Sequence, residues 1–379
     1  MSKTLQNYAT LINDTIQSNE INHYITTDNM CQNLGGIDTF KNINIPQGKV
    51  RSFQKDDILL SNIRLYFRKV YRAKQKGGCS SDVLVFRAKH IDSATLFAIL
   101  SSQIFTDYAC SGSQGSKMPR GNKTHMMDFK IPTINFTIAK IFNSIQNKIE
   151  NNHKINELLH KILELLYEQY FVRFDFLDEN NKPYQTSGGK MKFSKELNRL
   201  IPNDFEVKTL GELTQLKVGN KNANHSSNQG KYPFFTCSNN PLRCETYQFE
   251  GKHIIISGNG NFYVTHYDGK FDAYQRTYVV NPNNPNHYVL IYLFVKSYTN
   301  YLKLQSRGSI IKFITKSDIE NIKIVLPNLK TYTKWNNVLK MIENNMQSNQ
   351  TLTALRDFLL PLLLKQQVKP KQKPKISNK

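Results

Sequence analysis

Two long stretches of the sequence share one spacing of apolar residues. In residues 136–171 apolar side chains recur at alternating steps of three and four, and residues 331–364 repeat the pattern. This spacing predicts two helices that each lay an apolar seam along another helix. In the first helix the predicted seam residues are Ile138, Ile141, Ile145, Ile155, Leu159, Ile162 and Leu166.

The two stretches are copies of each other. The tetrapeptide Ile-Glu-Asn-Asn begins at Ile149 and again at Ile342. A single amphipathic helix would more often belong to the core of one domain, but the duplication favours two helices that pack against each other in antiparallel orientation. Aligning the copies matches Asn156 with Asn349, Leu159 with Leu352, Ile162 with Leu355 and Leu166 with Leu359.

Each predicted helix has an asparagine in the middle of its seam, Asn152 in the first and Asn345 in the second. A buried asparagine at such a position costs stability and fixes the register of the pair. About 35 residues at 1.5 Å each make a rod of roughly 50 Å, longer than one turn of B-form DNA at about 34 to 36 Å. The pattern therefore predicts helices that hold a fixed length.

The regions before the helices also resemble each other. In both, short apolar strands and glycine-rich turns precede helical segments, at an offset near 193 to 196 residues. The sequence thus predicts an α/β (α+β) protein with a pseudo-two-fold internal repeat, in which an antiparallel two-helix coiled coil separates two globular domains. We expect domains at 1–135 and 205–330, long helices at 136–171 and 331–364, an extended, irregular linker at 172–204 and a disordered basic tail at 365–379.

The amino-acid composition limits the kinds of partner that the protein can bind. The 379 residues carry a formal net charge of +22, which favours an anionic partner such as nucleic acid or an acidic membrane. No run of 18 apolar residues and no hydrophobic leader occur, so we expect no membrane association and a cytoplasmic protein. The five cysteines form no C-x-x-C pair, which indicates reduced thiols and no metal site.

Catalytic motifs are missing from the sequence. There is no phosphate-binding P-loop, and no Asn-Pro-Pro-aromatic segment that would mark a base methyltransferase. Asp204 and Glu206 are the only suggestive acids for a metal-dependent nuclease, and a solvated strand edge is the more common origin of such a pair. We therefore expect no catalytic residue in this chain.

Without catalytic motifs, recognition of DNA is the function that the side chains still favour. Arginine, lysine and asparagine near turns are the side chains that contact base edges and phosphates. The candidate DNA-binding residues are Arg64, Arg68, Lys69, Arg72, Lys117, Arg120 and Lys123 in the first region, and Lys217, Asn220, Lys221, Asn239, Arg243, Arg276, Arg307 and Lys312 in the second.

Several segments together resemble one family, the DNA specificity subunits of type I restriction-modification systems. They are DDILLSNIR and HIIISGNGN in the two regions, LQSRGSIIKFITKSDIENIKIVLP at the end of the second, and the linker pieces FDFLDENNKPYQTSGGKM and IPNDFEVKTLGEL. The chain departs from the family where the usual Pro-Pro-x-x-x-Gln opening of the long helix is replaced by PTINFT and PNLKTY.

The resemblance implies a non-catalytic protein with two target-recognition domains. Each domain would read one half of a split target in double-stranded DNA, while the helices set the unread spacer and dock modification (methyltransferase) subunits, two per chain. It also implies restriction subunits as partners. No cofactor would bind this chain, because S-adenosylmethionine belongs to the modification subunits, and ATP and magnesium to the restriction subunits.

Two alternatives come from other classes. The chain could be the recognition part of a self-contained restriction enzyme, with Asp204 and Glu206 in metal-assisted hydrolysis, or a scaffold that binds nucleic acid without sequence preference. Cleavage of DNA by the chain alone with magnesium would favour the enzyme. Affinity that collapses with salt and ignores sequence would favour the scaffold.

Overall fold

The computed structural model describes residues 3–38, 43–131, 133–227, 229–238, 240–308, 312–327 and 333–364. The predicted basic tail, residues 365–379, and the candidate Asn239 lie outside this part. Contacts divide the chain into unit 1, residues 1–154 with 345–379, and unit 2, residues 155–344. The boundary falls inside both long helices, so each unit contains a segment of both.

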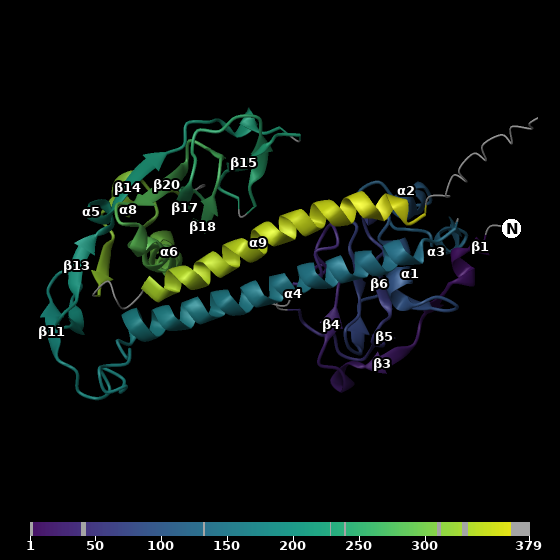
Figure 1. Ribbon diagram of the computed structural model, residues 1–379, viewed down its shortest axis with the longest axis horizontal. Coiled ribbons are helices and arrows are strands. Elements are labelled where there is room, and N and C mark those ends of the chain that lie inside the picture. The colour runs from purple at the N-terminus through teal and green to yellow at the C-terminus, as the bar shows by residue number, and fades with distance from the viewer. Residues whose placement is uncertain are drawn as a thin grey trace, which may run out of the picture. The chain divides into compact units, whose positions relative to one another are not determined.

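Unit 1 begins with two four-stranded sheets and a short two-stranded pairing (Figure 1). The first sheet has the order β2-β9-β6-β7, and α1 packs on it. Its strands are β2 (Ala9–Ile12), β9 (Val83–Ala88), β6 (Ile58–Ser61) and β7 (Val70–Arg72). The second sheet contains β3 (Thr15–Gln17), β5 (Lys49–Phe53), β8 (Gly77–Cys79) and β4 (Tyr24–Ile25), and the pairing joins β1 (Lys3–Thr4) to β10 (Lys130–Ile131). The helices are α1 (Ser93–Leu100), α2 (Gln103–Ser111) and α3 (Lys123–Met127).

Unit 2 repeats this order. Its four-stranded sheet is β14-β20-β17-β18, built from β14 (Thr214–Val218), β20 (Thr277–Pro282), β17 (Lys252–Ser257) and β18 (Val264–Asp268). A three-stranded sheet contains β16 (Leu242–Cys244), β15 (Tyr232–Phe235) and β19 (Asp272–Ala273), and β13 (Glu206–Thr209) pairs with β21 (Lys323–Leu326). The helices are α5 (Leu210–Leu213), α6 (Tyr288–Ser297), α7 (Thr299–Gln305) and α8 (Lys316–Glu320). The predicted mixed fold with an internal repeat is confirmed.

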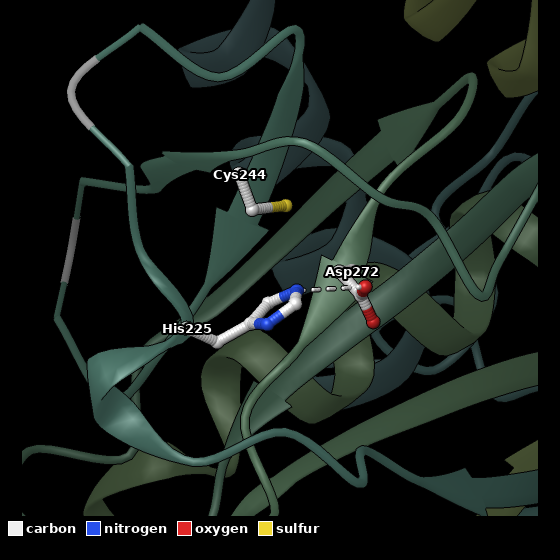
Figure 2. Close-up of side chains that lie close together, drawn as sticks. All are labelled: His225, Cys244 and Asp272. Atoms are coloured by element: carbon white, nitrogen blue, oxygen red, sulfur yellow. Dashed lines mark ion pairs between the residues drawn. The ribbon is translucent and has the colours of Figure 1, made fainter.

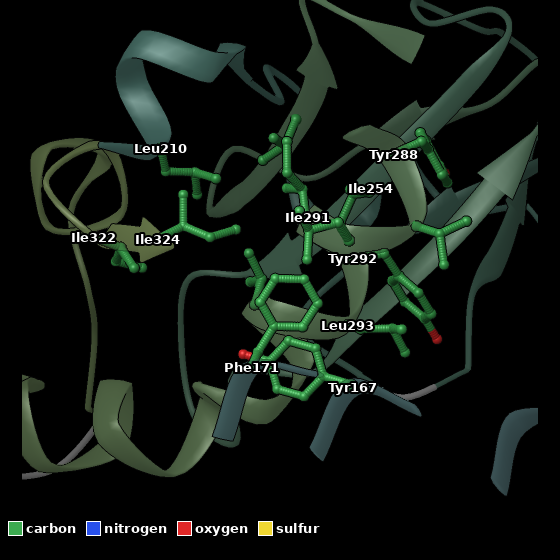
Figure 3. Packing of buried hydrophobic residues seen from close by; sticks show 14 of the residues in the cluster. Tyr167, Phe171, Leu210, Ile254, Tyr288, Ile291, Tyr292, Leu293, Ile322 and Ile324 are labelled. Atoms are coloured by element: carbon green, nitrogen blue, oxygen red, sulfur yellow. The ribbon is translucent and has the colours of Figure 1, made fainter. Parts of the chain in front are cut away.

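The core of unit 2 lies where α6 covers the sheet and meets the C-terminal part of the first long helix. Figure 3 shows the rings of Tyr167 and Phe171 close to Leu293 in this core. The two rings stack with centroids 5.3 Å apart. Burial at this depth raises the pKa of Tyr167 to about 12, so its hydroxyl stays protonated.

The two long helices are α4 (Phe136–Tyr167) and α9 (Thr333–Leu359). The predicted ends extended a few residues further: residues 168–172 form a π-helix after α4, and residues 360–362 a 3-10 helix after α9. The linker differs from the prediction, because residues within it pair as an antiparallel hairpin, β11 (Met191–Ser194) with β12 (Arg199–Pro202). None of the described helices is long and apolar enough to cross a lipid bilayer.

Asparagines do fix contacts between α4 and α9. In unit 1 Asn152 donates to Asn349 Oδ1 at 2.8 Å, and Asn349 donates to the Ile149 carbonyl at 3.2 Å. In unit 2 Asn156 donates to the Ile342 carbonyl at 3.1 Å. Since Asn156 and Ile342 lie 193 residues from Asn349 and Ile149, the last two bonds are equivalent under the repeat. Asn152 lies buried as predicted and is bonded to Asn349, whereas Asn345 is only half-buried.

One layer of the helix pair breaks the repeat. In unit 1 the buried Arg356 donates to Gln146 Oε1 at 3.1 Å, although only 2% of the arginine is exposed. The equivalent positions in unit 2, at the same offset of 193, are Leu163 and Leu339, which are both fully buried. A polar layer in unit 1 therefore corresponds to an apolar layer in unit 2.

The predicted seam was wrong at three positions. Ile141, Ile155 and Ile162 are 40 to 46% exposed, while Ile145 is buried and Leu159 and Leu166 pack on the core of unit 2. The helix carries a second apolar stripe on its outer face, which the spacing alone did not separate from the inner one.

Candidate nucleic-acid interface

A tight turn follows the central strand β6 of unit 1. Arg64 and Arg68 both have φ near +49° and stand on either side of the 3-10 helix Leu65–Phe67. The left-handed conformation at both ends folds the chain back, so that Ser61 N donates to the Lys69 carbonyl at 3.0 Å as β7 begins. The middle of the turn leaves the ring of Tyr66 exposed.

The loop after α2 crosses this turn and is hydrogen-bonded to it. Arg64 N donates to the Pro119 carbonyl at 2.9 Å, and Gly121 N donates to the Asn62 carbonyl at 3.1 Å. Asn62 N in turn donates to the Asp82 carbonyl at 2.7 Å, which ties in the loop before β9. Three separate segments thus form one backbone framework.

The side chains on this framework are mostly basic. The Arg64 guanidinium lies 3.4 Å from the Lys117 carbonyl, and Arg120 pairs with Asp82 at 2.9 Å while more than half of its side chain stays exposed. Lys117 is exposed beside them. The structure therefore brings Arg64 together with Lys117 and Arg120, which lie more than 50 residues later in the sequence.

Unit 2 builds the same framework after strand β17. Gly260 N donates to the Lys312 carbonyl at 2.9 Å, Ile314 N to the Gly258 carbonyl at 3.0 Å, and Gly258 N to the Arg276 carbonyl at 2.7 Å. These bonds match those of unit 1 at offsets of 193 to 196. Arg276, Arg307 and Lys312 are exposed here, and Arg307 also pairs with Asp318 at 3.2 Å.

Three other candidates of unit 1 use their charge within the protein. Arg68 donates to the Ser101 carbonyl at 2.9 Å, and burial lowers the pKa of its guanidinium. Lys69 donates to the Thr27 carbonyl, and the largely buried Arg72 lies 3.7 Å from Asp56. Lys123 is exposed at the start of α3.

The remaining candidates of unit 2 lie on or beside its sheets. Lys217, on β14, and Asn220 are exposed, and the exposed Arg243 donates to the Lys231 carbonyl at 3.3 Å. Lys221 is partly buried near Asp272. None of these four takes part in the turn framework.

The three-stranded sheet holds a polar cluster that the sequence did not reveal. His225, Cys244 and Asp272 offer ligand atoms within 4.8 Å of one another, and Figure 2 shows the imidazole directed at the carboxylate. No other group of three such side chains occurs among the described residues, so Asp204 and Glu206 find no third metal ligand there. The cluster could not be found from the sequence, because His225 and Cys244 do not have the spacing of zinc-finger ligands.

The contacts of this cluster favour a structural role. The fully buried Asp272 accepts from Thr246 Oγ1 at 2.8 Å and lies 3.4 Å from His225 Nε2 and 4.0 Å from Lys221 Nζ. Burial, with the nearby Asp272 charge, raises the pKa of the Cys244 thiol. Lys221 supplies positive charge where a cation would sit, and the protonated thiol is a poor metal ligand, so we interpret the cluster as an ion-pair network that anchors the sheet.

Comparison with known proteins identifies related chains. Residues 202–355 match the family model described as type I restriction modification DNA specificity domain. The EcoDI type I restriction enzyme specificity subunit of Escherichia coli is 34% identical over 173 residues, which cover 42% of this chain and 38% of that relative. The MjaIX specificity subunit of Methanocaldococcus jannaschii is 24% identical over 301 residues, 71% of this chain and 67% of that one.

A solved structure shares the fold over nearly the whole chain. The type I restriction-modification S subunit from M. genitalium matches with a TM-score of 0.61 at 16% sequence identity, covering 97% of this chain and 96% of that one. At this identity the likeness concerns the fold. The matched part of the first relative is short, since it spans only 38% of the E. coli protein.

Proposed function

We propose that this chain is a type I restriction-modification DNA specificity subunit, the non-catalytic subunit that selects the DNA target of such a complex, because residues 202–355 match the family model and the chain is similar to specificity subunits. Each unit would read one half of a bipartite target in double-stranded DNA. The observation that carries the proposal is the duplicated framework described above, in which two units present different basic side chains on equivalent hydrogen bonds. Two similar readers with different side chains suit an asymmetric, two-part sequence.

The long helices would dock the modification subunits. Each unit exposes an equivalent apolar pair on its part of the helices, separated by 193 residues in the sequence. In unit 2 these are Ile162 and Leu165, 46 and 53% exposed, and in unit 1 Leu355 and Phe358, 44 and 70% exposed. Exposed apolar residues three apart on a helix form the stripe that a partner helix packs against. One pair per unit supports two modification subunits per chain.

The partners would supply the chemistry. We propose that S-adenosylmethionine binds the modification subunits and that restriction subunits bring ATP and magnesium, so that this chain contributes recognition alone. The net charge of +22 supports attraction to DNA whatever its sequence. The framework would then add the selectivity.

Methylation mapping tests the proposal. DNA from a host that expresses the cognate modification gene is sequenced with base-modification detection, with and without this chain. We expect methylation at one two-part motif with a fixed gap only when the chain is present. An active modification subunit that shows the same pattern without the chain would contradict the proposal.

A further inference from the structure

The two frameworks differ in length at one point. Between the strands, unit 1 uses the turn Asn62–Arg68 and unit 2 the shorter turn Gly258–Phe262. In both turns the third and the last residue have positive φ, Arg64 and Arg68 in unit 1 at +49° and Gly260 and Phe262 in unit 2 at +71° and +52°. The additional residues of unit 1 lie between these two positions, where the exposed Tyr66 stands in place of the exposed Asn261.

The equivalent positions exchange their side chains almost completely. Counting along the matching hydrogen bonds, Arg64 corresponds to Gly260, Asp82 to Arg276, and Arg120 to Phe313. Gln114 corresponds to Arg307, and both pair with the residue that crosses the turn, Arg120 in unit 1 and Phe313 in unit 2. The backbone therefore stays constant while the chemistry on its surface changes.

A constant backbone that carries variable side chains is what recognition of different DNA sequences requires. A backbone fixed by three segments holds side chains in place at low entropic cost, and arginine, lysine and asparagine make the directional contacts that distinguish base edges. The side chains that differ between the units include Lys117, Arg120, Arg276 and Lys312. They are exposed, so a difference in folding stability does not explain why they differ.

We propose, resting on the proposed function, that the turn frameworks are the base-reading surfaces of the two units. In unit 1 Arg64, Tyr66, Lys117 and Arg120 face the DNA bases of one half-site, and in unit 2 Asn261, Arg276, Arg307 and Lys312 face those of the other. Arg68, Lys69 and Arg72 hold the structure of unit 1 and contact no base.

Variants of the whole chain, mapped by methylation together with the modification subunit, test this assignment. R64G installs the residue that unit 2 has at this position and tolerates the positive φ, and R120A removes an exposed side chain. Each should relax one or more base positions in one half of the motif, by about 5- to 150-fold in discrimination for a lost bidentate contact, and leave the other half unchanged. R307A and K312A should relax the opposite half.

The control is K49A, which removes an exposed lysine from β5 on the other sheet of unit 1 and should leave the motif unchanged. Retention of the modification subunit and an unchanged melting temperature show that each variant is folded. Folded cluster variants that keep the wild-type motif, or that weaken methylation equally at all sites as a lost phosphate contact would, overturn the assignment. A wild-type complex without any motif instead refutes the proposed function itself.

Discussion

The turns after β6 and β17 are the most informative pair of regions in the molecule. Each is tied by an equivalent hydrogen bond, 2.9 Å long, to a loop that follows a helix: Arg64 N donates to Pro119 O after α2, and Gly260 N donates to Lys312 O after α7. One turn presents arginine and tyrosine, and the other asparagine and glycine. The two copies therefore share the backbone hydrogen bonds of the turn and differ in the side chains that the turn exposes.

The helix pair shows the opposite relation. One asparagine-to-carbonyl bond recurs in both units, whereas a buried layer differs, Gln146 with Arg356 in unit 1 against Leu163 with Leu339 in unit 2. Here the change lies inside the protein and affects stability.

The largest expected effect concerns the exposed apolar pair that each unit carries on its helices. L165E in unit 2 or F358E in unit 1 places a charge where we propose that a partner helix packs, so each variant should lose one of two modification subunits. Native mass spectrometry of the purified complex measures the stoichiometry. As the matched control, E157Q changes a polar residue of α4 and should keep both subunits. Loss of both subunits, or of neither, would show that the two pairs are not separate docking sites.

The next prediction concerns the buried polar layer of the helix pair, Gln146 with Arg356. Q146L removes one acceptor of the buried Arg356 guanidinium and should cost about 1 to 3 kcal/mol in the free energy of unfolding, because the arginine loses a buried hydrogen bond while its ion pair with Asp357 at 3.0 Å remains. The double variant Q146L/R356L gives unit 1 the leucine pair of unit 2 and should recover most of that loss. Chemical denaturation measures both. Equal destabilisation by the single and the double variant would count against the coupling.

A pH effect should belong mainly to unit 2. Burial, followed by the nearby charges of His160, Lys252 and Lys296, lowers the pKa of His266 to about 3. The folded state thus holds a neutral imidazole that the unfolded chain protonates below its ordinary pKa of about 6.5. The contribution of His266 to stability is therefore complete above that pH and is lost as the pH falls towards 3, at up to about 1.4 kcal/mol per pH unit.

H266Q tests this effect by thermal unfolding at several pH values. The carboxylate of Glu343, 3.5 Å from His266 Nδ1, opposes the shift, and Glu164 lies on the same part of α4 as His160. The position equivalent to His266 in unit 1 is Arg72, so unit 1 has no histidine there. A variant that loses stability with acid as steeply as the wild type would refute the role of His266.

Much of the fold could be predicted because its signals are periodic or repeated. The long helices and the duplicated units appear in the spacing of residues such as Leu159 and Leu352, and the mixed fold follows from the short strands between turns. The exposed positions of Ile155 and Ile162 could not be predicted, since a helix with two apolar faces does not reveal which one lies inside. The hairpin within the linker was missed because glycine and proline near it indicated irregular structure.

The sequence predicted which types of residue form the candidate site, but not which of them lie together. Arg64, Lys117 and Arg120 were identified from residue type and nearby turns, yet only the folded chain brings them together. Nothing in the sequence distinguished them from Arg68, whose guanidinium turns inward to the Ser101 carbonyl. Tyr66 and Asn261 were missed because their role depends on which turn residue points outward.

We propose that the long helices set the gap between the two half-sites. This proposal is tested most directly by inserting seven residues, one heptad, into both helices, after Lys154 in α4 and after the equivalent Gln347 in α9, and mapping methylation with the modification subunit. A heptad keeps the seam in phase and adds roughly 10 Å, about three base pairs. We expect both half-motifs to stay unchanged and the gap between them to become longer. An unchanged gap, with methylation retained, would contradict it.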